Sequence, residues 1–377
     1  MRFSTLATAI SIGFFFLFHP APLHGQESHS PLRQGPEEHH TTESGEGHGD
    51  SRDGSFNASE FILDHIGDSH EWHILTTPAG RHVSIYLPVI LYSRYSGLHF
   101  FSSEKLAHGH TYKGFQMGHG TVNGKSLEGK IVEVNQQGEM VDAGLPLDFS
   151  ITKNVFMMML SVIILLWVFL GLARSYKRMG IGEPKGLQGF LEPVIVFIED
   201  DVAKPNLGED KYERYMPYLL TVFFFILLNN LMGLIPFFPF GANVTGNIAV
   251  TFVLAACTFL ITTFSGNKGY WKHIFNTPGV PIILAPIMIP VEIIGMFTKP
   301  FALMIRLFAN ITAGHIIVLS LLSMIFIFKS VFMSVPTLVM VIFMDLIEIL
   351  VAFLQAYIFT LLSALFIGLA MPGHHHD

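Results

Sequence analysis

An ionisable side chain inside a long apolar segment is the first feature of this sequence that indicates chemistry. Arg306 lies in such a segment, and twenty-two residues separate it from the next lysine, Lys329. Arginine at the centre of a membrane helix costs roughly 2.5–3.5 kcal/mol on insertion scales, so it indicates a functional site. Because a guanidinium does not release its proton in proteins, Arg306 can attract a carboxylate but cannot relay a proton. An electrostatic gate is therefore the favoured role, and a structural arginine paired with a neighbouring carboxylate is the alternative.

Helical spacing places further polar groups around Arg306. Asn310 is one turn away on the same face, whereas His315, nine residues on, is rotated about half a revolution at 3.6 residues per turn. The next apolar segment carries three polar residues near one face, because positions i and i+7 nearly eclipse: Asp345, Glu348 and Gln355. Such groups along water-accessible helix faces are what a proton relay requires. The alternatives are a buried structural histidine and a glutamate that only caps or pairs.

The composition places these residues in a membrane protein. Of 377 residues, 50% are hydrophobic and only 14% are charged, and the mean hydropathy is positive at +0.48. Soluble chains carry about 25% charged residues. Five segments are long enough for about 30 Å of hydrocarbon. They lie near residues 154–173, 216–236, 247–264, 281–328 with proline breaks, and 334–371. The predicted fold class is an all-α membrane protein of about five transmembrane helices, ending in a long tilted helical hairpin, within a domain at 151–377.

The distribution of basic residues predicts the orientation. The loop after the first span carries Arg174, Lys177, Arg178, Lys185, Lys204 and Lys211. A second loop carries Lys268 and Lys272 after the third span. The loop at 237–246 has none. Since loops rich in Lys and Arg stay in the cytoplasm, the N-terminus is expected outside and the C-terminus inside.

The N-terminal part differs in composition from the spans. Residues 1–25 have the layout of a signal peptide, with an uncleaved anchor as the alternative. Residues 26–60 are polar and His-rich, which indicates a disordered exported tail. Residues 61–150 contain β-branched and aromatic runs such as His82–Tyr92 and Lys130–Val134, with a turn signal at Asn123-Gly124. We therefore expect a small extracytoplasmic region rich in β-strands.

The first basic loop contains an amphipathic segment. Apolar residues recur there at helical spacing: Leu187, Phe190, Leu191, Val194, Ile195, Ile198 and Val202. Such a helix either lies on the membrane surface or covers a partner. The equally weighted alternative is an ordinary loop helix packed on its own protein.

Several motifs together resemble subunit a of the F-type ATP synthase. They occur in the family's order: Leu191–Pro193 with Ala203–Pro205, Asn229–Pro236, Lys299–His315 and Leu354–Phe359. The resemblance covers residues 185–371 approximately and implies a proton channel subunit in a bacterial inner membrane. Its implied partners are a ring of c subunits, b-type peripheral stalk subunits and the remaining ATP synthase complex. The resemblance implies nothing firm about residues 26–150.

The resemblance implies roles for three of the intramembrane residues. Arg306 matches the essential arginine that faces the rotating c ring and pairs with each passing carboxylate. His315 and Glu348 match an interacting acid–histidine pair in the outer half-channel. Some members carry the acid and the imidazole at the opposite positions, so this chain has the exchanged arrangement.

Three further polar residues match positions on the implied proton path. Asn310 and Gln355 match polar residues that line the outer half-channel. Glu292 matches an acidic residue towards the cytoplasmic half-channel. It precedes Arg306 by fourteen residues and shares its face only if the helix continues through Pro300.

Two other classes of function are considered. One is a secondary transporter of metal or small ions with the His-rich tail as a collector, because fourteen of the 19 histidines precede residue 120. Their spacing shows no compact ligand set, so no metal site is predicted. The other is a membrane enzyme, but no nucleophile–base set or phosphate-binding loop is found. We expect a non-catalytic chain with no cofactor, bound to lipid and to no nucleic acid.

Overall fold

The computed structural model describes most of the chain from residue 65 onward. It describes Ala58 and Ile62 and the ranges 65–76, 82–118, 121–122, 125–127, 129–135, 145–179, 186–235, 239–275, 285–328 and 330–371. The predicted signal peptide, 1–25, lies outside the described residues, as does the predicted His-rich tail, 26–60, apart from Ala58.

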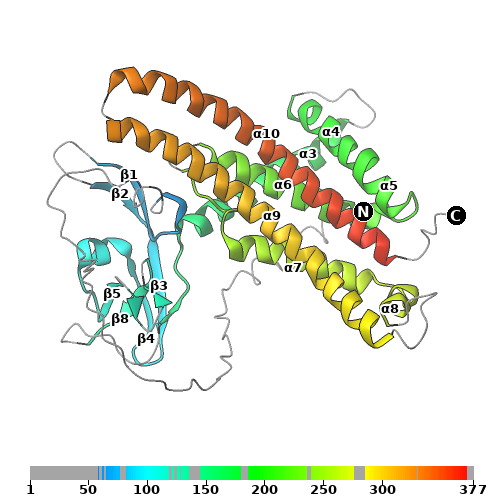
Figure 1. The fold of residues 1–377 in the computed structure, drawn as a ribbon, viewed down its shortest axis with the longest axis horizontal. Coiled ribbons are helices and arrows are strands. Elements are labelled where there is room, and N and C mark those ends of the chain that lie inside the picture. Colours follow the sequence, from blue (N-terminus) through cyan, green and yellow to red (C-terminus); the bar gives the residue numbers. More distant parts are fainter. Residues whose placement is uncertain are drawn as a thin grey trace, which may run out of the picture.

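A small β-rich module precedes the helices (Figure 1). Its strands are β1 Glu71–Thr76, β2 His82–Tyr86, β3 Pro88–Ser93, β4 Gly97–Ser102, β5 Phe115–Met117, β6 Thr121–Val122, β7 Lys125–Ser126, β8 Ile131–Glu133 and β9 Leu147–Asp148, with a 3-10 helix, η1, at Ser103–Gly109. The pairs are antiparallel, and β3 lies between β4 and β9. Inward side chains of β3 and β4, including Val89, Leu91 and Phe101, pack on Leu106 and Phe115. The predicted strand-containing region is therefore present.

The rest of the chain is helical. The helices are α3 Lys153–Met179, α4 Leu187–Phe197, the π-helix η2 Ile198–Ala203, α5 Lys204–Leu207, α6 Tyr212–Gly233, α7 Ile248–Ser265, α8 Lys268–Phe275, α9 Ala285–Phe328 and α10 Val331–Ala370. Five of those described, α3, α6, α7, α9 and α10, are long and apolar enough to cross a membrane. The predicted fold class is confirmed, and α9 and α10 form the long C-terminal hairpin (Figure 1).

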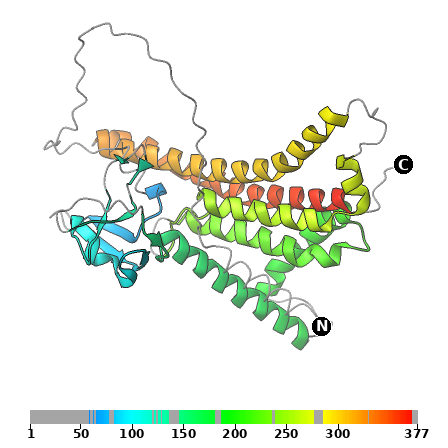
Figure 2. The ribbon, with the colours of Figure 1, turned by 90° about the horizontal axis from the view of Figure 1, so that it is seen from below.

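The breaks expected within 281–328 do not occur in the described part, because α9 is one continuous helix of 44 residues. It contains Pro290 and Pro300 in its interior. A proline removes one backbone hydrogen bond, but membrane helices tolerate it where neighbouring helices and local adjustments satisfy the freed groups. The effect is a bend: Figure 2 shows the first part of α9, in yellow, turning away from α10. Bends of this kind are nearly always found at proline.

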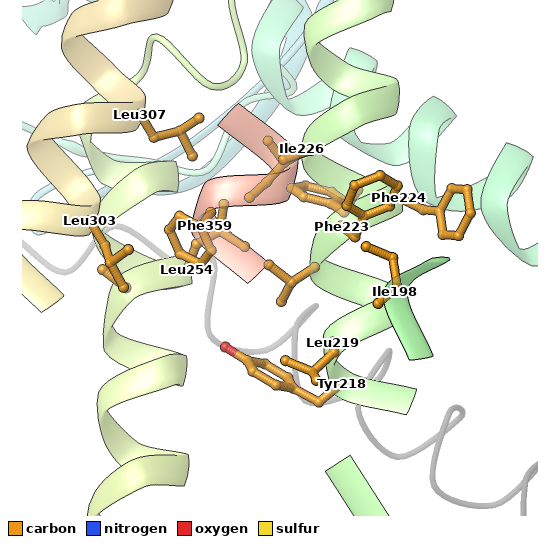
Figure 3. Close-up of a cluster of buried hydrophobic side chains, with 14 of the residues drawn as sticks. Ile198, Tyr218, Leu219, Phe223, Phe224, Ile226, Leu254, Leu303, Leu307 and Phe359 are labelled. Atoms are coloured by element: carbon orange, nitrogen blue, oxygen red, sulfur yellow. The ribbon is translucent and has the colours of Figure 1, made fainter. Parts of the chain in front are cut away.

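A core of large apolar side chains sets the rotation of the helices. Figure 3 shows Leu303 and Leu307 of α9, Leu254 of α7, Phe359 of α10, and several residues of α6 converging. Leu303 and Leu307 are one turn apart, and each is only 1% exposed. Since these two residues must face the core, they determine which side of α9 points away from it.

The amphipathic segment of the first basic loop forms α4 and η2. Leu191 and Ile198 are buried against the rest of the protein. Leu187 and Phe190 are exposed. One side of this helix therefore packs on its own protein, as the second alternative expected. The other side is uncovered, and its placement on the membrane surface or against a partner stays a prediction.

The β-rich module is attached to the start of α3 by side-chain contacts. The Thr152 hydroxyl donates to the Asp68 carboxylate at 2.8 Å, and the Asn154 N–H donates to its other oxygen at 3.2 Å. The Trp72 ring packs edge-on against Phe156, with ring centroids 5.9 Å apart. These contacts fix the module relative to the first membrane helix.

Asp148→Asn is expected to destabilise the β-rich module and to remove part of the pH dependence of its stability. His70 donates from Nε2 to the Asp148 carboxylate at 2.8 Å. Burial disfavours the charged form of Asp148, but the hydrogen bonds from His70 and Ser150 and the charge of His70 outweigh it and lower the pKa of Asp148. A lowered pKa contributes stability that is present above the unfolded value of about 3.9 and is lost as pH falls through the folded value. We expect a contribution of roughly 1–2 kcal/mol at neutral pH.

The measurement is urea unfolding of the detergent-solubilised chain, followed by Trp72 fluorescence with Trp167 and Trp271 replaced by Phe. The urea midpoint of the parent should fall between pH 7 and pH 3 by more than that of Asp148→Asn. Equal pH dependence of the two proteins would contradict the assignment.

Candidate functional site

The charged side of α9 points away from the protein core. Arg306 is exposed, whereas its neighbours Leu303, Met304 and Leu307 are buried. Among the residues that the structure describes, no Asp or Glu forms an ion pair with Arg306. The expectation of a structural arginine with a private carboxylate partner therefore finds no support within the described chain.

Small residues surround Arg306 on the exposed side of α9. Ala302 and Ala309 lie one turn before and after it, and Ala313 lies one turn further on. All three are exposed. Small residues let the backbones of two membrane helices approach closely. The exposed side of α9 therefore combines a fixed positive charge with a surface that fits another helix, and we call Ala302, Arg306, Ala309 and Ala313 the arginine face.

His315 and Glu348 meet on the opposite side of α9. The His315 Nδ1 lies 3.7 Å from the Glu348 Oε2, and their side chains are 16% and 11% exposed. They line a small cavity with room for about one water molecule. Its lining residues are Asn230, Leu234, Asn310, Ile311, Gly314, His315, Glu348, Val351 and Ala352. The separation exceeds that of a direct hydrogen bond.

One oxygen of the Glu348 carboxyl group is available to a mobile partner. Glu348 Oε1 is buried and accepts no hydrogen bond from the described residues. A buried polar oxygen without a partner is costly. The cavity has room for about one water molecule beside this oxygen, so water is the partner that it fits. The cavity can therefore carry protons between water, imidazole and carboxyl group.

Asn310 connects the cavity and the arginine face. Asn310 lines the cavity together with His315, and it is also exposed, as Arg306 is. On the other wall, the Thr245 hydroxyl donates to Asn230 Oδ1 at 2.5 Å, and Asn230 Nδ2 donates to the Ala352 carbonyl at 3.4 Å. A polar edge thus runs from the enclosed pair to the exposed side of the helix.

The two remaining predicted site residues lie outside this cavity. Gln355 is only 5% exposed, but it does not belong to the cavity lining. Glu292 is half-buried, about 21 Å before Arg306 along the helix axis by the rise of 1.5 Å per residue. It lies near Tyr270 of α8, where burial and the charge of Glu292 raise the pKa of the phenol. Because α9 continues through Pro300, Glu292 and Arg306 lie near the same side of the helix. The bend in α9 is the one departure from this alignment.

Sequence reasoning did not assign three residues that shape the site. Asn230 lines the cavity, the Thr245 hydroxyl holds Asn230 in place, and Gly314 gives the Glu348 carboxyl group its room. Asn230 lies in a motif that supports the family resemblance, so a signal existed for it. Gly314 likewise lies in the motif Lys299–His315. Thr245 had no comparable signal, because its role depends on which helices are neighbours.

Gly314→Ala is expected to displace the Glu348 carboxyl group and lower proton flux. A Cβ atom at this position would lie 2.7 Å from Glu348 Oε1 and 3.1 Å from its Cδ, closer than real contacts allow. The end of the side chain must then move within the cavity. Gly295→Ala on the same helix is the matched control, since its Cβ would meet nothing within 4 Å.

The measurement for this pair of variants is proton pumping by the assembled complex in membrane vesicles. Gly314→Ala should pump more slowly than the parent, and Gly295→Ala should match the parent. Equal rates for both variants would show that the position of the Glu348 carboxyl group does not limit the flux.

Metal ligands are a separate question. Among the described ranges, no group of three or more His, Cys, Asp or Glu side chains is arranged to hold a metal ion. The His-rich segment 26–60 lies outside those ranges, so the hypothesis of a metal-collecting tail rests on the sequence alone.

Comparison with known proteins gives two family matches and many relatives. Residues 155–368 match the family described as ATP synthase A chain, and residues 61–149 match the family described as Domain of unknown function (DUF8433). The chain is 50% identical over 235 residues to "ATP synthase subunit a" of Chloroherpeton thalassium, covering 61% of this chain and 69% of the relative. It is 54% identical over 238 residues to "ATP synthase subunit a 2" of Chlorobaculum tepidum, covering 61% and 66%.

A more distant relative shows a similar overlap. The protein "ATP synthase subunit a" of Anaeromyxobacter sp. is 43% identical over 257 residues, which cover 66% of this chain and 61% of the relative. The chain thus spans about two thirds of the length of the relatives that it matches.

Proposed function

Because this chain belongs to the ATP synthase A chain family, we propose that it is the proton-translocating stator subunit of an ATP synthase. It provides two offset half-channels to a ring of c subunits and couples proton flow to rotation and ATP synthesis. In this proposal it lies in a bacterial inner membrane, with a periplasmic N-terminus and a cytoplasmic C-terminus. The b-type stalk subunits hold it, and the chemistry of ATP formation belongs to other subunits.

The observation that carries this proposal is the arginine face of α9. The Arg306 guanidinium lies on the outside of a membrane helix and has no carboxylate partner in the described chain. If only lipid surrounded it, exposing this charge to the bilayer would cost free energy. A carboxylate on a neighbouring helix offsets that cost. The alanines beside Arg306 fit such a helix at close range. A ring of c subunits, each carrying a membrane carboxylate, has both properties.

The cavity beside the arginine face supports the outer half-channel. In this proposal, protons enter the cavity at His315 and Glu348 and pass along Asn310 towards the exposed side of α9. Arg306 does not relay protons, so a proton must move onto the carboxylate of the ring. After rotation, the proton leaves on the side of Glu292. Arg306 separates the two paths and thereby forces rotation.

A cross-linking experiment tests the proposed partner. Cysteine at Ala309, in a background in which the single cysteine Cys257 is replaced by Ala, is paired with a cysteine beside the c-subunit carboxylate. Oxidation of the assembled complex should give a disulfide between this chain and a c subunit. The matched control is Ile163→Cys on α3, which is also exposed but lies on another helix.

The two cysteines should behave differently if the proposal is right. Ala309→Cys should form the cross-linked product, and Ile163→Cys should not. A complex in which neither position, or only Ile163→Cys, reaches a c subunit would overturn the proposed placement of the ring.

A further inference from the structure

The sheet formed by β4, β3 and β9 is apolar on both sides. Its inner side packs on η1, β5 and β8 through Val89 and Leu91, which are fully buried. Four large apolar side chains are exposed on its other side, and we call them the outer sheet face: Tyr92, Leu98, Phe100 and Leu147. Leu98 is 71% exposed and Phe100 is 68% exposed.

The strand register makes these side chains one continuous surface. Tyr92 of β3 pairs with Leu98 on one side and with Leu147 on the other. Phe100 follows two residues after Leu98, on the same side of β4. A sheet that faces water alternates apolar and polar residues, and an exposed contiguous apolar patch marks an interaction surface.

The outer sheet face is held close to the start of the first membrane helix. β9 ends at Asp148, and the first candidate span begins at Lys153. The connection continues alongside β3, because Phe149 N–H donates to the Ile90 carbonyl at 2.8 Å and Ile151 N–H to the Pro88 carbonyl at 3.1 Å. Five residues reach at most about 18 Å, so the sheet lies near the membrane boundary.

The direction of the face follows from the layers of the module. In Figure 1, η1, β5 and β8 lie on the side of β3 and β4 that is away from the helices. The uncovered side of the sheet is therefore directed towards the side on which the helices extend. The strands run across the helices rather than continuing them (Figure 1). In this orientation the outer sheet face can lie along a membrane surface.

The hairpin between β3 and β4 adds the residue types that membrane interfaces favour. Arg94 and Tyr95 form its tip, both are exposed, and Tyr95 is 72% exposed. Tyrosine is enriched at headgroup level because one end of its ring is apolar and the other polar, and arginine binds lipid phosphates. We propose that the outer sheet face and this tip dock onto the lipid headgroup region of the leaflet in which α3 begins.

The attachment to α3 makes such docking directional. The hydrogen bonds from Thr152 and Asn154 to Asp68 prevent the module from rotating freely on the helix. A docked sheet then keeps the first membrane helix at a fixed tilt. The proposal does not depend on the proposed coupling function, because it uses only the module and the first span.

Spin labels on the assembled complex test this proposal. With Cys257 replaced by Ala, a nitroxide is attached at Leu98→Cys and, as a control, at Glu104→Cys on η1, which lies on the other side of the module. The complex is reconstituted into vesicles that contain anionic phospholipid. Collision rates with apolar oxygen and with a water-soluble nickel chelate are measured at each label, and proton pumping confirms that both complexes are assembled.

The collision rates separate three occupants of the face. We expect Leu98→Cys to collide more with oxygen and less with the nickel chelate than Glu104→Cys does. Equal access of both labels to the nickel chelate would show a water-exposed face and overturn the proposal. Poor access of Leu98→Cys to both reagents would show that a protein, such as a second copy of the chain, covers it, and would overturn the proposal as well.

Discussion

Arg306→Ala is expected to lower ATP-driven proton pumping by roughly a hundredfold or more, the scale on which removal of one preorganised charge acts. The variant removes the only group on the arginine face that can hold a passing carboxylate and block direct proton passage. The complex should still assemble, because Leu303 and Leu307, which anchor α9 in the core, are unchanged. Acidification of inverted vesicles after addition of ATP measures the effect.

Two control variants make this result specific. Arg306→Lys keeps a positive charge but loses the planar guanidinium, and a desolvated lysine can release its proton. It should therefore pump at an intermediate rate. Lys299→Ala removes a cation two turns earlier on nearly the same side of α9, where Lys299 lies over the Phe366 ring, and it should pump at a rate near that of the parent. Normal pumping by Arg306→Ala would refute the proposed role.

Glu348→Gln is expected to produce the second large loss, roughly tenfold or more in proton flux, as is typical when a proton-transfer group is removed. The amide cannot take up or release a proton, while its size and shape are nearly those of the acid. Its partner His315 stays in the cavity. Passive proton flux through the membrane sector, measured after removal of the catalytic sector, checks this without interference from ATP hydrolysis.

An exchange variant tests whether His315 and Glu348 act as a pair. Each single replacement, His315→Glu or Glu348→His, leaves two like groups 3.7 Å or so apart and should lose most of the flux. The double variant restores one acid and one imidazole and should recover part of it. Because Gly314 has no Cβ, an imidazole at position 348 can use the space beside this glycine that the Glu348 carboxyl group now fills. A double variant that is no better than the single ones would show that the two residues act independently.

The sequence alone determined the features that depend on local composition and period. Five apolar segments predicted five membrane helices because a bilayer demands about 20 apolar residues per crossing, and the described part of the chain contains five helices long and apolar enough to cross one. The strand signals were also correct where the structure describes them: Val122 of β6 pairs with Lys125 of β7. The turn expected at Asn123-Gly124 lies outside the described residues. The nine-residue spacing from Arg306 to His315 likewise predicted that the two side chains point in opposite directions, since the helical period is fixed by backbone geometry.

Only the tertiary structure decided which of these directions faces the core and which faces outward. Periodicity gives the angle between Arg306 and His315, but the packing of α9 against α7 and α10, which buries Leu303 and Leu307, selects the side that is covered. The same holds for the cavity, where Asn230 and Gly314 meet Glu348 from helices that are distant in the sequence. A local pattern cannot specify these contacts, because they depend on the simultaneous packing of several helices. The same packing lets α9 remain helical at the prolines where the sequence predicted breaks.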